Sequence, residues 1–134
     1  PTPEQIAAAG ADVAAAVDAA LAAVDPDRRA TSLIGLAGSV TTVAALALGL
    51  DGYRSDLIHH AEISYDEVAK VTSTLLRQTR EERLAHPAMH PGRADVIGAG
   101  ALVLRTIMER CGAQSVVASE HDILDGIADG LRKP

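Results

Sequence analysis

The chain has 134 residues, a formal net charge of −6 and a hydrophobic fraction of 48%, so it is expected to form a packed core of one domain or of part of a larger one. The acidic balance disfavours duplex nucleic acid as a partner, because binding phosphates along a duplex requires a basic face. The absence of Phe and Trp also argues against single-stranded nucleic acid, which binds on aromatic platforms.

The first predicted element is a helix that begins at the start of the chain. Thr2 is a typical N-cap, Pro3 suits the first helical position, and Gln5 can complete a capping box. Apolar residues recur at helical spacing as far as Val24, and Pro26 ends the helix. Because the chain starts directly on a capping signal, we expect it to have been cut from a longer protein.

The segment Ser32–Thr42 predicts a strand, a tight turn and a helix. Ser32–Leu36 is apolar enough for a short buried strand, whereas Ala37–Ser39 is too small and flexible to continue it. Val40–Leu48 then predicts an apolar helix. A helix that starts after such a turn has unpaired backbone N–H groups, and phosphate oxygens bind well there. The alternative is a turn that serves packing alone.

The second half of the chain is predicted to be mainly helical. Leu50–Leu57 is expected to be a loop and Ile58–Ile63 a short extended segment, and Ser64 and Glu67 form a second capping box. The elements that follow are a helix from that box with Val68, Val71 and Leu75 inward, a charged segment 79–85, a proline loop 86–92, a helix 93–111, a strand 115–118 and a last helix after Asp122.

Periodicity also predicts what the last two helices bury. One face of helix 93–111 collects Ile97, Ala101, Leu104 and Met108. Gly98 and Gly100 allow a neighbour to pack closely against this helix. The inward face predicted for the last helix is Ile123, Ile127 and Leu131. Two strands separated by roughly 75 residues and flanked by helices predict a parallel pair in a helix-rich α/β fold.

Cysteine content and hydropathy limit the remaining possibilities. The single cysteine, Cys111, excludes an internal disulfide framework and a cysteine-rich zinc site. The longest apolar run identified, Val40–Leu50, is too short to span a bilayer. We therefore expect a cytoplasmic protein with no membrane partner.

With these elements in place, the chain resembles the C-terminal part of the exopolyphosphatase / guanosine pentaphosphate phosphohydrolase (Ppx/GppA) family. Ile34–Leu46 is similar to the family's second glycine loop and the apolar helix after it, and Ile58–Ser64 is similar to its Val-His-Gly…Leu-Ser segment. Pro91–Gly100 is close to its Pro-Gly-Arg-Ala-Asp-x-Ile-x-x-Gly signature, which is the most specific of the three.

Five residues depart from the family pattern. Ala37 and His60 stand where glycine is usual, and Ser39 stands where threonine is usual. Asp122 and Leu124 replace a glycine and an arginine of the usual ending, which puts in doubt the arginine contribution that the family makes from this helix.

The resemblance implies a fold and an activity. The expected fold is a partial ribonuclease-H-like domain of the actin-like ATPase superfamily, with two short parallel strands here and the remaining strands of the sheet outside this chain. Residues 1–134 then form the C-terminal part of the second actin-like domain. The implied activity is hydrolysis of the terminal phosphoanhydride of inorganic polyphosphate or guanosine pentaphosphate, with Mg²⁺ in the intact enzyme.

The same resemblance places the catalytic glutamate and the first phosphate loop before this chain. We therefore assign no catalytic residue and no metal ligand here, and we expect the fragment alone to be inactive. The phosphate-binding residues carried over are Gly38, Ser39, Thr41 and Arg93. Arg93 suits this role because a guanidinium can hold phosphate oxygens bidentately. The alternatives are an ion pair with Asp95 or a salt bridge that connects two helices.

Other charged and imidazole side chains have more ordinary explanations. Arg77, Arg80 and Arg83 are interpreted as a solvated helical face, with a polyphosphate track as the alternative. The histidine pairs 59/60 and 86/90 are interpreted as local polar contacts rather than as metal sites, because neither has an organised carboxylate beside it.

A second hypothesis is a non-catalytic helical module that binds a partner or a regulatory nucleotide. An exposed sheet edge and an exposed apolar face also favour self-association, so a homodimer is expected.

Overall fold

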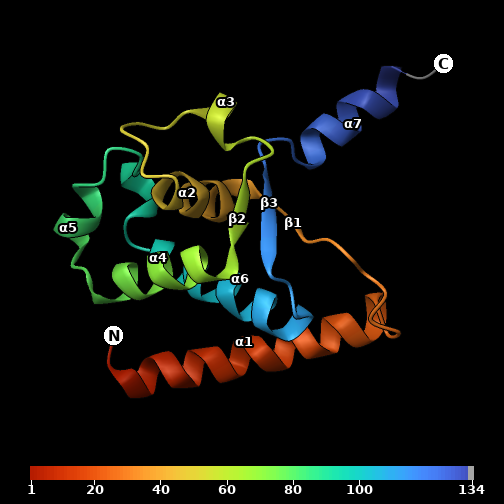
Figure 1. Cartoon of the computed structure of the whole chain (residues 1–134), viewed down its shortest axis with the longest axis horizontal. Helices are drawn as coiled ribbons and strands as arrows, with labels where there is room; N and C mark the ends of the chain where they lie inside the picture. The colour runs from red at the N-terminus through yellow and green to blue at the C-terminus, as the bar shows by residue number, and fades with distance from the viewer. Residues whose placement is uncertain (133–134) are drawn as a thin grey trace.

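The structure, a computed structural model, describes residues 1–132 and is a helix-rich α/β fold (Figure 1). The elements in chain order are α1 (Pro3–Val24), β1 (Ile34–Leu36), α2 (Ala37–Ala47), α3 (Ser55–Ile58), β2 (Glu62–Ser64), α4 (Tyr65–Arg77), α5 (Arg80–Leu84), the 3-10 helix η1 (Pro91–Arg93), α6 (Ile97–Cys111), β3 (Ser115–Ser119) and α7 (Ile123–Arg132).

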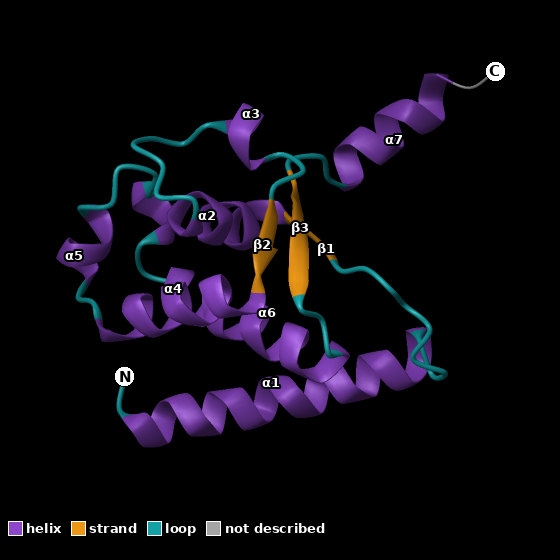
Figure 2. Cartoon of the chain, in the orientation of Figure 1, coloured by secondary structure: helices purple, strands orange, loops and turns teal. Residues whose placement is uncertain are grey.

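Three short strands form a mixed sheet in the order β1–β3–β2 (Figure 2). β1 runs parallel to β3, with Leu36 opposite Ser119. β2 runs antiparallel to β3, with Ile63 opposite Val116. The predicted parallel pair is confirmed, but the prediction of only two strands is wrong, because β3 also pairs along its second edge. The prediction of a loop over residues 50–57 is wrong for its last three residues, because helix α3 begins at Ser55.

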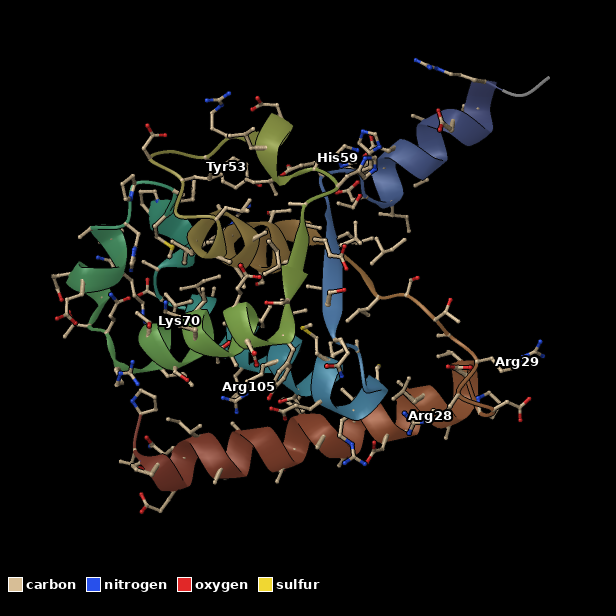
Figure 3. The ribbon with its side chains drawn as sticks, in the orientation of Figure 1. Arg28, Arg29, Tyr53, His59, Lys70 and Arg105 are labelled. Atoms are coloured by element: carbon tan, nitrogen blue, oxygen red, sulfur yellow. The ribbon has the colours of Figure 1, made fainter. Side chains whose placement is uncertain are left out.

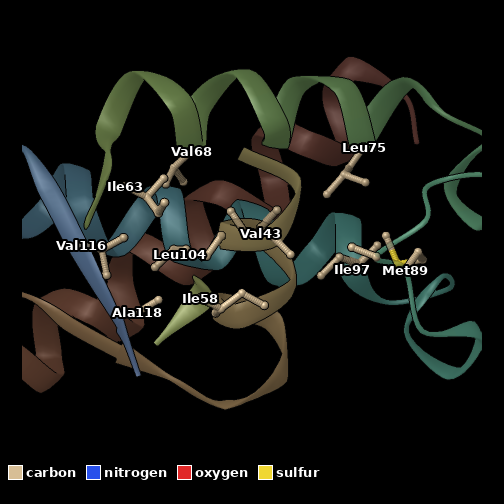
Figure 4. Packing of buried hydrophobic residues seen from close by; sticks show 14 of the residues in the cluster. Val43, Ile58, Ile63, Val68, Leu75, Met89, Ile97, Leu104, Val116 and Ala118 are labelled. Carbon is tan, nitrogen blue, oxygen red and sulfur yellow. The ribbon is translucent and has the colours of Figure 1, made fainter. Parts of the chain in front are cut away.

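The core lies between one face of the sheet and helices α2, α4 and α6 (Figure 4). Alternation along β3 directs Val116 and Ala118 into this core, and Ile63 of β2 points the same way. The predicted inward face of α6 is confirmed, since its four apolar residues are all buried: Ile97, Ala101, Leu104 and Met108.

The starts of α1, α4 and α5 follow local sequence signals. The capping boxes predicted at Thr2 and Ser64 are both present, and Thr79 forms a third at the start of α5. These signals are local, because each cap bonds to a residue three positions further along the chain.

The opposite face of the sheet is open in the described part of the chain. Ile34 is 65% exposed and Leu36 is 50% exposed. The inward face predicted for α7 is wrong: Ile123, Ile127 and Leu131 are 75%, 55% and 82% exposed. Periodicity identified an amphipathic helix correctly, but α7 projects away from the other elements and residues 1–132 provide no surface to cover it (Figure 1).

Helix α1 packs along the outer side of α6 (Figure 1). Its Asp18 carboxylate pairs with Arg110 of α6 at 2.6 Å. By length and composition α1 alone among the described helices could cross a membrane, with a mean hydropathy of 1.6 over 18 residues. It is a longer apolar segment than Val40–Leu50, which corrects the expectation from sequence, and none of its 18-residue window is buried in the structure.

Candidate anion site at the start of helix α2

The strand-to-helix junction is tighter than predicted. Helix α2 begins at Ala37 with Leu36 as its N-cap, so the separate turn expected at 37–39 is wrong. The chain reverses through a left-handed backbone at Ala37, where φ is +70°. Within residues 1–132 no side chain caps this helix. The N–H groups of its first turn are therefore left for water or a ligand.

Arg93 lies directly against this helix start. A Cβ built on Gly38 would lie 2.6 Å from Cζ of Arg93, so the guanidinium packs on the bare glycine backbone. Its Nη1 donates to Thr42 Oγ1 at 3.0 Å. No carboxylate among the described residues pairs with Arg93, because Asp95 bonds Arg80 at 2.9 Å instead. The alternative Arg93–Asp95 ion pair is therefore wrong.

The segment that carries Arg93 is held in place on both sides. His90 accepts a hydrogen bond from the Gly92 N–H at 3.1 Å, which caps η1. Ala94 is fully buried, and its carbonyl accepts a hydrogen bond from Arg83 Nη1 at 3.0 Å. The backbone on each side of Arg93 is thus anchored by a specific contact.

The electrostatics of this arrangement favour an anion. The N-terminus of a helix carries a partial positive charge, and the guanidinium of Arg93 adds a full one beside it. None of the ion pairs among the described residues involves Arg93, so its charge is not neutralised by a carboxylate. An anion with several oxygens can accept from the N–H groups of both the helix start and the guanidinium.

Ser39 and Thr41 occupy different positions at this junction. Ser39 is exposed, and a Cβ on Gly100 would lie 2.9 Å from the Ser39 Cβ, so Gly100 lets α6 approach α2 closely as predicted. Thr41 is buried, and its hydroxyl lies 2.8 Å from the phenolic oxygen of Tyr53. A free Thr41 hydroxyl is therefore not offered at the surface.

Tyr53 joins the site to the end of strand β3. Its hydroxyl lies 2.7 Å from Glu120 Oε1 and its ring lies under Arg93, with Cζ 5.9 Å from the ring centroid. Burial raises the pKa of the Tyr53 phenol, and the Glu120 carboxylate adds to the rise. Figure 3 shows Tyr53 and His59 at the same end of the molecule, beyond the carboxyl ends of β1 and β3.

Three imidazoles lie next to Glu120. The ring centroid of His59 is 3.8 Å from that of His60 and 4.5 Å from that of His121. The Glu120 N–H donates to His59 Nδ1 at 3.2 Å. Desolvation lowers the pKa of His59, and the other two imidazoles lower it further.

The other histidine pair makes local contacts. His86 Nε2 lies 3.0 Å from Gln78 Oε1, and His90 caps η1. Across residues 1–132 no three His, Cys, Asp or Glu side chains come together as a metal site. The side chains of this segment therefore do not fit a Mg²⁺ site on their own.

One of the three arginines assigned to a solvated face is structural. Arg83 Nε donates to the Leu75 carbonyl at 2.9 Å, and its guanidinium packs on Gly98. The solvated-face interpretation is therefore wrong for Arg83. Arg77 and Arg80 are exposed, as expected.

Gly38, Ser39 and Thr41 lie in the first turns of α2, and Arg93 packs against this helix start through Gly38 and Thr42. Their role in phosphate binding stays a prediction. Sequence reasoning missed three further side chains: Thr42, Tyr53 and Glu120. Thr42 could have been inferred from its place in the glycine-loop match. Tyr53 and Glu120 meet across 67 residues, and nothing local in the sequence marks that contact.

Replacing Gly38 by alanine is expected to separate binding from stability. The new Cβ would occupy the position of the Arg93 guanidinium, so we expect phosphate affinity to fall about fivefold. The free energy of unfolding should stay within about 1 kcal/mol of that of the unmodified chain, because the flexible arginine side chain can move aside. Calorimetric titration with tripolyphosphate measures the first quantity and urea denaturation the second. Gly10→Ala is the control, because a Cβ there meets nothing within 4 Å. Unchanged affinity in Gly38→Ala would show that the guanidinium does not bind from this position.

Comparison with known proteins identifies the family of the chain. The sequence model of the Ppx/GppA phosphatase family matches residues 1–132. Exopolyphosphatase 2 of Mycobacterium tuberculosis is 41% identical over 135 residues, which cover 98% of this chain and 42% of that protein. The bifunctional 3-dehydroquinate synthase/phosphatase of Fusobacterium nucleatum is 30% identical over 101 residues, which cover 75% of this chain and 15% of that protein.

Solved structures show the same fold. The crystal structure of an exopolyphosphatase-like protein superposes with a TM-score of 0.93 at 38% identity, covering 98% of this chain and 44% of that one. A Ppx/GppA phosphatase of Aquifex aeolicus superposes with a TM-score of 0.86 at 21% identity, covering 97% of this chain and 42% of that one.

The family model over residues 1–132 and the relative at 41% identity show the class of protein. The chain belongs to the Ppx/GppA phosphatase family. It spans about two-fifths of the length of the exopolyphosphatase that it matches.

Proposed function

We propose that this chain is one wall of the phosphate-binding cleft of an intact exopolyphosphatase, and that the start of helix α2 together with Arg93 binds the terminal phosphate of the substrate. The observation that carries the proposal is the packing of the Arg93 guanidinium on Gly38 with a threonine hydroxyl, and no carboxylate of the described residues, as its side-chain partner. Membership of the family and the exopolyphosphatase relatives support the substrate class.

Each residue of the site has a definite role in this proposal. The N–H groups of Gly38 and Ser39 donate to phosphate oxygens, and Arg93 supplies charge-assisted bonds. Thr41 acts indirectly, because its hydroxyl is bound to Tyr53. During hydrolysis water attacks the terminal phosphorus, the anhydride P–O bond breaks and inorganic phosphate leaves. Fixed donors around that phosphate stabilise the charge that moves onto its oxygens.

Several finer properties complete the proposal for the intact protein. The family resemblance supports an actin-like, ribonuclease-H-like domain of which residues 1–134 are the C-terminal part, and it supports guanosine pentaphosphate as an alternative substrate. It also supports a Mg²⁺ requirement, with the metal held by groups outside this chain. A homodimer and a cytoplasmic location belong to the same proposal. The fragment alone is proposed to be inactive, because the catalytic glutamate implied by the resemblance is not among its residues.

The test is the binding of tripolyphosphate to the chain, followed by calorimetry. We expect measurable binding by the unmodified chain and about tenfold weaker binding by Arg93→Ala, because a charge-assisted contact is lost. Arg29→Ala is the matched control: it removes the same charge from an exposed loop residue at the opposite end of the molecule from Tyr53 (Figure 3).

Two outcomes would contradict the proposal. Equal losses in Arg93→Ala and Arg29→Ala would mean that only net charge matters. No binding by the unmodified chain would leave the interaction module as the better hypothesis, for which the exposed apolar residues of β1 and α7 are the supporting observation.

A further inference from the structure

Tyr53 connects three segments that are far apart in the sequence. It lies between helices α2 and α3, its hydroxyl reaches Thr41 of α2, and the same hydroxyl reaches Glu120 just after β3. Its ring faces the guanidinium of Arg93. A single side chain therefore contacts the helix that begins the candidate anion site, the cation of that site and the residue that follows the central strand β3.

The direction of these hydrogen bonds follows from proton counting. A phenol carries one proton and a carboxylate carries none, so Tyr53 donates to Glu120. The hydroxyl of Thr41 then donates to the phenolic oxygen across the 2.8 Å contact. Both bonds fix the phenolic oxygen, and through it they fix the ring plane that faces Arg93.

Packing alone would not hold this ring. Tyr53 is 42% exposed, its neighbour Gly52 is half-buried, and its other neighbour Arg54 is exposed and forms an ion pair with the nearby Asp56. A Cβ added at Gly52 would meet nothing within 4 Å. The two hydroxyl contacts are therefore the specific interactions that orient the ring.

We propose that Tyr53 is a positioning residue of the anion site, which holds the Arg93 guanidinium over Gly38 and so sets the affinity for a terminal phosphate. This inference rests on the proposed function, since it assigns to Tyr53 a role in the same site. Thr42 and the ring of Tyr53 hold the guanidinium at two points, and its remaining N–H groups are available to the anion.

The pKa of Tyr53 should also report whether phosphate is bound at the candidate anion site. Its phenol loses a proton more easily beside a free cation than beside a cation neutralised by phosphate. Bound phosphate is therefore expected to raise the pKa of Tyr53, and ionisation of Tyr53 is expected to weaken phosphate binding by the same factor. The chain has two Tyr and no Trp, so in Tyr65→Phe the phenolate absorbance comes from Tyr53 alone.

The experiment compares Tyr53→Phe with Tyr65→Phe. Tyr65 is a matched control, because its hydroxyl also donates to a carboxylate, that of Glu109 at 2.8 Å, and because it lies at the start of α4 rather than at the anion site. We expect tripolyphosphate to bind Tyr53→Phe about tenfold more weakly, with Tyr65→Phe unchanged. In Tyr65→Phe, phosphate should shift the absorbance titration of Tyr53 to higher pH, and adding Arg93→Ala should abolish that shift.

The outcomes separate this inference from the function on which it rests. Binding by the unmodified chain with equal affinity in Tyr53→Phe, or a titration of Tyr53 that phosphate does not move, overturns the positioning role and leaves the anion site intact. Absence of binding by the unmodified chain overturns both. If Tyr53→Phe loses affinity but also unfolds at lower urea, the titration in the folded Tyr65→Phe variant decides.

Discussion

Replacing Ile63 by alanine is expected to destabilise the chain by about 3 kcal/mol, measured as the free energy of unfolding in urea. Ile63 is 1% exposed and lies in the middle of β2, opposite Val116 of β3. Figure 4 shows its side chain between the sheet and Val68 of α4. Removal of three carbons at this point leaves a cavity that the sheet and the helix cannot both close.

Ile123→Ala is the matched control, because it removes the same atoms from a residue that is 75% exposed. Its expected effect is within about 0.5 kcal/mol. Equally small losses in the two variants would contradict the placement of the core between the sheet and α4. Equally large losses would instead indicate that the exposed face of α7 is covered in solution.

Arg83→Ala is expected to cost about 2 to 3 kcal/mol, because two carbonyls lose charged donors. Those carbonyls belong to Leu75 in the last turn of α4 and to Ala94 beside Arg93. The same variant should weaken tripolyphosphate binding, since the anchor of the Arg93 segment is lost. Urea denaturation and calorimetry measure the two effects.

Arg80→Ala provides the comparison for Arg83→Ala. Its ion pair with Asp95 joins two side chains that are 50% and 63% exposed, so its loss is expected to cost less than about 1 kcal/mol. A larger loss in Arg80→Ala than in Arg83→Ala would reverse the structural assignment of the two arginines. Retained phosphate affinity in Arg83→Ala would mean that η1 keeps its position without this contact.

The parts of the fold that could be predicted are those set by neighbours in sequence. The Thr2 and Ser64 caps and the buried face of α6 depend on residues within a few positions, and all were predicted. The errors depend on distant partners. β2 exists because Ile63 pairs with Val116, and α7 is exposed because the described chain offers nothing to cover it.

The residues of the candidate site also fall into those that the sequence could identify and those that only the folded structure reveals. Gly38 and Arg93 could be proposed because each lies in a motif of the family, although the two residues are far apart in the sequence. Tyr53 and Arg83 could not, since a tyrosine in a loop and an arginine in a charged helix look like ordinary surface residues. Their roles come from hydrogen bonds to Glu120 and Ala94, which only the folded chain brings within reach.

Two departures from the family pattern acquire a physical meaning in the structure. Ala37 has φ of +70° and His60 has φ of +67°. Both stand where the family usually has glycine, the residue that adopts this backbone without steric cost. An L-residue there costs about 1 kcal/mol. Both strained positions lie at the end of the sheet next to the candidate anion site, and backbone strain of this kind clusters at functional sites.

The guanidinium that faces the positive end of α2 has a practical consequence for handling the protein. Without a ligand the two groups repel each other, so purification buffers with and without orthophosphate should give different melting temperatures. At a phosphate concentration of about ten times the dissociation constant, the gain is about 1.4 kcal/mol. Storage in phosphate buffer would therefore stabilise the folded protein. The bound phosphate would also mask weak ligands for the same site in a binding screen.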